Sequence, residues 1–140
     1  MFHKILVAYD GPVGAQRALM AAIEQNRCAP AEVHVLAVEE HLPHTVATVD
    51  EFDDERAHAN AYFELMLERA RRQAEEYGLK IQTELRVGHP ARTIVDVARA
   101  GDYDLIVMGH SGRFQVWTAF LGTTAERVSR HAPCSALIVR

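Results

Sequence analysis

A short apolar run that stops in glycine restricts the fold of this chain more than any other feature. Residues 105–108 are all apolar, and Gly109 follows them directly. A run this short and this apolar is typical of a strand that is covered on both faces, as in a parallel sheet. Gly112 comes three residues later, and Gly122 then precedes a segment with the pattern of a helix start.

These glycines suggest a phosphate-binding site. Glycine at 109 and 112 leaves backbone N–H groups unobstructed, so a ligand can approach the main chain closely. A helix that starts after Gly122 adds the positive end of its dipole, which favours an anion. Taken singly, Gly109 or Gly122 is far more often a plain turn or cap than part of a binding site. Thr123 and Glu126 also form a capping-box pattern, so the Thr123 hydroxyl has a second use in the helix itself.

Apolar spacing along the rest of the chain predicts strands and helices in strict alternation. The alternation favours an α/β fold with a parallel sheet and right-handed crossovers. A long connection is expected between residues 39 and 54, where histidines and acids follow no period and no metal-ligand spacing. Strands are predicted over 5–9, 33–38, 81–87, 105–108 and 135–140, the third at a sheet edge, and helices follow 12, 54, 90 and 123. The second helix is expected to end at Tyr77, with Gly78 as its stop and an apolar stripe from Phe63 to Tyr77 in the core. Pro90 is expected at the first position of the third helix, and His89 is expected to cover the turn before it rather than to reach a ligand.

Length and composition limit the possible functions. With 140 residues and 49% apolar content we expect one domain spanning residues 1–140. The formal charge of −4 argues against a nucleic-acid partner, since phosphate backbones are met by clustered Lys and Arg. No apolar run is long enough to span a bilayer and no signal-peptide pattern is present, so a cytoplasmic protein without a membrane partner is expected. Cys28 and Cys134 suggest neither a disulfide nor a zinc site and are expected to be small buried residues.

Four stretches of the chain resemble the universal stress protein family. The spacing Gly109, Gly112, Gly122 followed by threonine is similar to the nucleotide-binding motif of that family, and the residues around 4–11, 87–90 and 134–140 are also alike. The resemblance implies a Rossmann-like fold of the adenine nucleotide alpha hydrolase type, with five parallel strands in the order 3-2-1-4-5. Strand order then reverses between the strands that end at Asp10 and Gly109, which is where such sheets bind ligands.

The resemblance also assigns roles to individual residues. It implies that Asp10 holds a ribose hydroxyl and that the backbone of Val38 meets adenine, although an Asp at a strand end also serves as a plain cap. Arg113 is open to two interpretations, as a phosphate ligand or as part of a helical turn that packs aromatic rings. The remaining residues are implied to line the base and sugar (Ala8, Met108) or to bind phosphate (Gly109, Gly112, Gly122, Thr123, Thr124).

The function that the resemblance implies is ATP-dependent regulation of a stress response. ATP, ADP or AMP is the expected ligand, with or without Mg²⁺, and the expected partners are an unidentified regulatory protein and a second copy of the chain bound through the C-terminal strand. No catalytic residue is predicted, because only His110 lies near the motif as a base, so hydrolysis is expected to be slow or absent. The alternative is a protein-interaction module of the same fold that binds no nucleotide. An adenylating enzyme is disfavoured, because the segment after Asp10 lacks the Ser-Gly-Gly loop of such enzymes.

Overall fold

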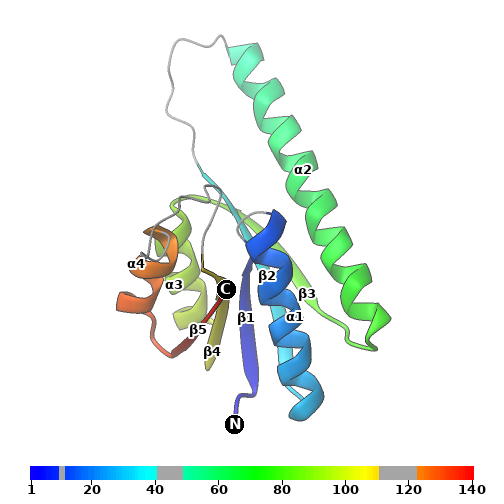
Figure 1. The fold of residues 1–140 in the computed structure, drawn as a ribbon. Coiled ribbons are helices and arrows are strands. Elements are labelled where there is room, and N and C mark those ends of the chain that lie inside the picture. The colour runs from blue at the N-terminus through cyan, green and yellow to red at the C-terminus, as the bar shows by residue number, and fades with distance from the viewer. Residues whose placement is uncertain (10–11, 41–48, 111–122) are drawn as a thin grey trace.

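The computed structural model describes residues 1–9, 12–40, 49–110 and 123–140. Five strands form one parallel sheet in the order β3-β2-β1-β4-β5, which confirms the predicted fold class (Figure 1). The strands are β1 (Lys4–Tyr9), β2 (Glu32–Glu39), β3 (Gln82–Val87), β4 (Leu105–Gly109) and β5 (Ser135–Val139). The helices are α1 (Pro12–Cys28), α2 (Val49–Glu76), α3 (Pro90–Ala100) and α4 (Thr123–His131).

Two apolar cores lie on the two faces of the sheet. Alternate residues of β1 point to opposite faces, so Ile5 and Val7 join the core under α1 and α2, whereas Leu6 and Ala8 join the core under α3 and α4. The helices cover the two faces accordingly (Figure 1). Because β1 and β4 lie in the middle of the sheet and are covered on both sides, their continuous apolar runs are explained.

The long helix α2 differs from its predicted extent at both ends. Phe63, Met66 and the following apolar stripe are buried as predicted, but Tyr77 is 46% exposed, so its assignment to the core was wrong. The helix ends at Glu76, so Tyr77 lies just beyond it, and the chain turns at Gly78, which has a positive φ of 75°. At the other end, residues 49–53 are helical rather than part of a loop. The apolar period that located the rest of the helix does not extend into them.

The two cysteines are also placed differently from expectation. Cys28 is exposed, so the prediction that it is buried was wrong, while Cys134 is partly buried. Cys28 is the last residue of α1. The buried stripe of α1 continues to Ala29 and leaves Cys28 on the outer side.

A polar cluster closes the amino-terminal end of the sheet. The Tyr103 hydroxyl lies 2.8 Å from His34 Nδ1, and Lys4 Nζ lies 4.6 Å from the centre of the Tyr103 ring. Lys4 also donates through Nζ to the Gly101 carbonyl at 2.6 Å. The second ring nitrogen of His34 is buried and has no hydrogen-bond partner in the described part of the chain. Burial lowers the pKa of His34, and Lys4 acts in the same direction, while Glu32 and Glu84 oppose it.

Stability should therefore decrease in mild acid because of His34. Its ordinary pKa is 6.5, so just below pH 6.5 the unfolded chain takes up a proton that the folded chain refuses, and the free energy of unfolding falls with pH. Urea unfolding across this range should show a shallower pH slope in His34→Gln than in the parent. His131→Gln, at the exposed end of α4, is the matched control and should keep the parental slope. An unchanged pH slope in His34→Gln would show that His34 is not the source of the loss of stability in mild acid.

Candidate functional site

The crevice at the carboxyl ends of β1 and β4 is the point where strand order reverses. In the sheet, β2 lies on one side of β1 and β4 lies on the other. The connections that follow β1 and β4 therefore leave toward opposite sides, which opens a crevice between them. Ala8 and Met108 are register partners in these two strands and are 1% and 2% exposed. Both belong to the core beneath α3 and α4, so they form an apolar floor under this end of the sheet.

Gly109 marks a close approach between β4 and α1. A Cβ atom at residue 109 would lie 2.8 Å from the Cα of Gly14, nearer than real Cβ contacts occur. Gly14 belongs to the first turn of α1, so two glycines together let this helix start beside the end of β4. The predicted role of Gly109 concerned access for a ligand. Its packing against Gly14 is an additional constraint that the sequence analysis missed.

The end of β2 contributes one predicted and one unexpected residue. Val38 is half-buried and packs against the core under α3 and α4. The next residue, Glu39, is only 8% exposed, and its Oε2 atom is buried with no hydrogen-bond partner among the residues that the structure describes. Its carbonyl accepts the Gly88 N–H at 2.9 Å, which ties the end of β2 to the turn after β3. Glu39 looked like part of a polar loop in the sequence, and no local pattern indicated that it is buried.

His89 connects the two helices on this face of the sheet. It is the N-cap residue of α3, where its Nδ1 accepts from the Arg92 N–H at 3.4 Å, and Pro90 follows at the first helical position. Its other ring nitrogen, Nε2, lies 2.9 Å from Nη1 of Arg127 on α4. His89 therefore acts as a helix cap, a role that differs from the expected one of covering the turn. The contact with Arg127 was not predicted.

Helix α4 begins where the sequence pattern placed it. Thr123 is its first residue, and Thr124 is half-buried. Glu126 lies in the first turn, where its carboxylate pairs with Arg130 at 2.8 Å. The amino-terminal ends of α3 and α4 thus lie on the same face of the sheet, beside the apolar floor (Figure 1).

Part of the predicted site lies outside the described residues. Asp10, Gly112, Arg113 and Gly122 belong to this part, as does the side chain of Thr123, and their roles remain predictions. The structure brings the other predicted residues to one end of the sheet. Among residues 1–9, 12–40, 49–110 and 123–140, no group of three His, Cys, Asp or Glu side chains could hold a metal ion. In the same part of the chain, no helix is long and apolar enough to cross a membrane.

Comparison with known proteins gives a consistent result over the whole chain. The family model described as "Universal stress protein family" matches residues 1–140. The universal stress protein YxiE of Bacillus subtilis is 32% identical over 148 aligned positions that cover 100% of both chains. The solved structure of UspA from Lactobacillus plantarum has a TM-score of 0.90 at 26% identity, covering 99% of this chain and 98% of that one. A universal stress protein of Archaeoglobus fulgidus in complex with dAMP has a TM-score of 0.67 at 26% identity, with coverage of 99% and 98%.

Side chains added at residue 109 should destabilise the protein in proportion to their size. Gly109→Ala places a Cβ against the backbone of Gly14, which cannot move aside cheaply, and should cost about 1–3 kcal/mol of unfolding free energy. Gly109→Val should cost more, because its two methyl groups extend the same clash. Urea unfolding of the parent and the two variants measures both effects. Equal stability of all three proteins would show that the approach of α1 to β4 is looser than described.

Proposed function

Because this chain belongs to the universal stress protein family, we propose that it binds an adenine nucleotide in the crevice at the carboxyl ends of β1 and β4. The observation that carries the proposal is the side-chain-free end of β4 at Gly109, which lies at the reversal of strand order above the Ala8 and Met108 floor. The Archaeoglobus relative, solved with dAMP, supports the class of ligand.

The proposal gives each part of the nucleotide a place. Adenine would meet the backbone of Val38 at the end of β2 and lie over the apolar floor, since a planar base favours an apolar surface. Asp10 would accept hydrogen bonds from the ribose hydroxyls. The phosphates would lie toward the start of α4, where the helix dipole favours negative charge. Their proposed ligands are Gly109, Gly112, Arg113, Gly122, Thr123 and Thr124.

ATP is the proposed physiological ligand, with ADP and AMP as its shorter relatives and Mg²⁺ as a companion of the phosphates. The proposed activity is regulation of a stress response in the cytoplasm, in which nucleotide occupancy changes binding to a second copy or to a regulatory protein. We propose no catalytic residue and no more than slow hydrolysis. The alternative function, a protein-interaction module without nucleotide, shares the fold and differs only in the crevice.

Calorimetric titration with ATP and Mg²⁺ separates the two functions. The parent, freed of co-purified nucleotide, should bind ATP, and Gly122→Val should not, because its side chain would occupy the space proposed for the phosphates. Circular dichroism of the variant checks that its fold is retained. The absence of binding by a folded parent would support the nucleotide-independent module instead. Equal ATP binding by the two proteins would show that the phosphates do not lie against residue 122.

We also propose that the chain forms a homodimer through β5. This strand is at the edge of the sheet, so one row of its backbone N–H and C=O groups has no partner strand within the sheet. The side chain of its middle residue, Leu137, is 42% exposed, which is unusual for a large apolar side chain on an edge strand. Pairing with the same strand of a second copy about a two-fold axis would cover both features. The opposite edge, β3, carries the charged pair Glu84 and Arg86, 2.6 Å apart, which discourages such pairing.

A charge at the centre of β5 should therefore dissociate the dimer. Leu137→Glu would place two carboxylates near the two-fold axis, while a side chain that is exposed in the monomer leaves its fold intact. Analytical ultracentrifugation should show a dimer for the parent and a monomer for the variant. Val87→Glu is the matched control, because Val87 is 38% exposed at the opposite edge and should leave the dimer intact. A dimeric Leu137→Glu protein would exclude β5 from the interface.

A further inference from the structure

The environment of His89 contains a conflict between two hydrogen bonds. Its Nδ1 faces the Arg92 N–H at 3.4 Å, and its Nε2 faces the Arg127 guanidinium at 2.9 Å. Both neighbours are donors, since a backbone amide and a guanidinium have no acceptor on nitrogen. A neutral imidazole accepts at only one nitrogen and carries the proton on the other. One of the two contacts must therefore be given up whenever the other is made.

The two tautomers of His89 correspond to two arrangements. With the proton on Nδ1, Nε2 accepts from Arg127 and the cap of α3 is lost, which agrees with the longer 3.4 Å distance to Arg92. With the proton on Nε2, Nδ1 caps α3 through Arg92, and Arg127 has no acceptor at the ring. Exchange between them removes one proton from Nδ1 to water and adds one to Nε2 from water, so the charge of the ring does not change.

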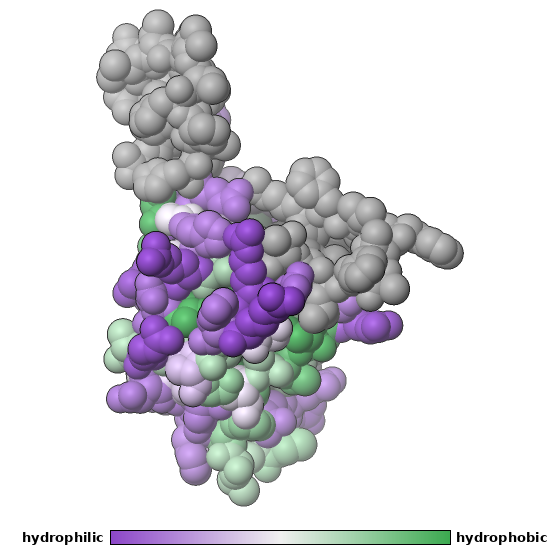
Figure 2. All heavy atoms as spheres, turned by 90° about the vertical axis from the view of Figure 1, so that its left-hand side faces the viewer, coloured by the Kyte–Doolittle hydropathy of each residue, from purple (hydrophilic) through white to green (hydrophobic). Residues whose placement is uncertain are grey.

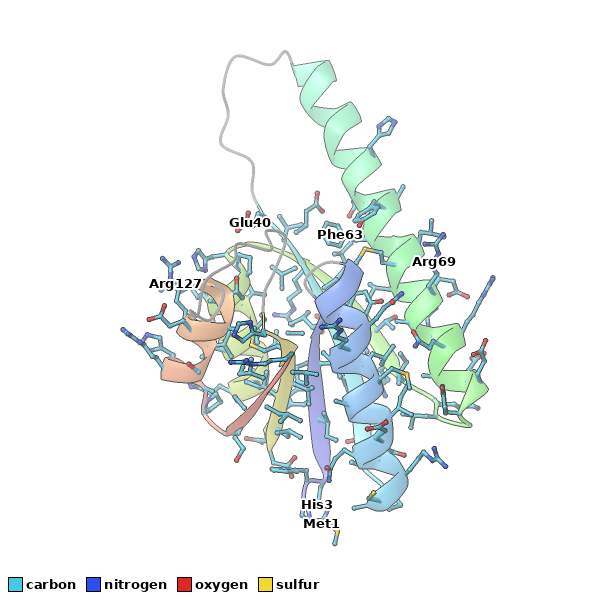
Figure 3. All side chains as sticks on the ribbon, in the orientation of Figure 1. Met1, His3, Glu40, Phe63, Arg69 and Arg127 are labelled. Atoms are coloured by element: carbon cyan, nitrogen blue, oxygen red, sulfur yellow. The ribbon has the colours of Figure 1, made fainter. Side chains whose placement is uncertain are left out.

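Arg127 lies at the end of the sheet where the phosphates are proposed to bind. His89 is the residue just before α3, so a guanidinium 2.9 Å from its ring is level with the amino-terminal end of that helix. Figure 3 shows Arg127 on the upper part of α4, toward the end of the sheet marked by Glu40. This is also the end to which the proposed phosphate ligands at the start of α4 belong. Arginine side chains in helices point back toward the amino terminus, which brings the guanidinium nearer to that start.

The positive charge of Arg127 is free to interact with a ligand. Within the described part of the chain, no carboxylate forms an ion pair with it, and Glu126 on the same helix is paired with Arg130. Arg127 is exposed on the α3 and α4 side of the molecule, much of which is hydrophilic (Figure 2). A planar guanidinium without a carboxylate partner, beside a helix amino terminus, suits the oxygens of a phosphate group.

We propose that Arg127 is a phosphate-binding residue of the nucleotide site and that His89 holds it in the empty protein. The inference rests on the proposed nucleotide-binding function and adds a residue to that site. When the phosphates bind, Arg127 leaves the imidazole for their oxygens, and His89 changes tautomer and caps α3. Ligand binding is thereby coupled to the start of α3, at the turn that is tied to Glu39 through Gly88.

The affinity test compares ATP with adenosine, which has the same base and sugar but no phosphate. Arg127→Gln should weaken ATP binding about tenfold or more, the usual effect of losing a charge-assisted hydrogen bond, and leave adenosine binding unchanged. Arg99→Gln is the matched control, because Arg99 is an exposed arginine in the last turn of α3, and it should bind both ligands as the parent does. Asparagine is a good N-cap that cannot hold Arg127 while capping, so His89→Asn should bind ATP at least as tightly as the parent.

The tautomer test uses nitrogen-15 NMR of the histidine rings, which distinguishes the two protonation patterns directly. The chain has eight histidines, and the His89 signals are identified by their absence from His89→Asn. The empty parent should show the proton on Nδ1, and addition of ATP should move it to Nε2. Adenosine should not produce this change, and neither ligand should produce it in Arg127→Gln.

The outcomes separate this inference from the function beneath it. If the parent binds ATP but Arg127→Gln and Arg99→Gln bind it as well as the parent does, the nucleotide site stands and the role of Arg127 is refuted. An ATP-bound parent that keeps the empty-state tautomer refutes the coupling to His89. If the folded parent binds neither ATP nor adenosine, the proposed function itself fails, and the inference fails with it.

Discussion

Burial of β1 and β4 on both faces is the constraint on which the remaining structure depends. A strand with apolar residues on both sides needs helices on both sides, and parallel strands need long crossovers that supply those helices. Ile5, Val7 and Val107 face α1 and α2, whereas Leu6 and Ile106 face α3 and α4. With β1 and β4 adjacent, the strand order reverses between them and places the crevice at their carboxyl ends.

The same constraint brings the start of α1 close to the end of β4. Helix α1 has to start directly after β1 and still cover β4, which brings Gly14 against the end of β4. A side chain at residue 109 has no room there, so glycine is required for packing as well as for ligand access. Gly109 is therefore needed both for packing and for the proposed ligand binding. A substitution at this residue lowers the stability of the fold, so a change in ligand affinity in such a variant does not by itself measure the binding role of Gly109.

Polar groups at the end of β2 and in the turn after β3 have incomplete hydrogen bonds. Among the described residues, Glu39 has a buried oxygen without a partner, and His89 has donors at both ring nitrogens. Such groups are costly in a folded protein and are found where a ligand or a change of arrangement completes them. At the other end of the sheet, the Asp104 carboxylate accepts from the N–H groups of His3 and Lys4. His34 Nε2, at that same end, is buried without a hydrogen-bond partner among the described residues.

The sequence alone determined the order of elements, the parallel sheet and the stretch of glycines, because these depend on periodicity and on residues close together in the chain. The effects of Gly109, Gly78 and Pro90 on the backbone are local. The sequence alone therefore predicted the end of a strand at Gly109, the end of a helix at Gly78 and the start of a helix at Pro90. Contacts between distant residues were not readable, since nothing local links Gly14 to Gly109 or His89 to Arg127. The tertiary structure alone decided them, because the sheet order and the packing of helices on its faces set which distant side chains meet.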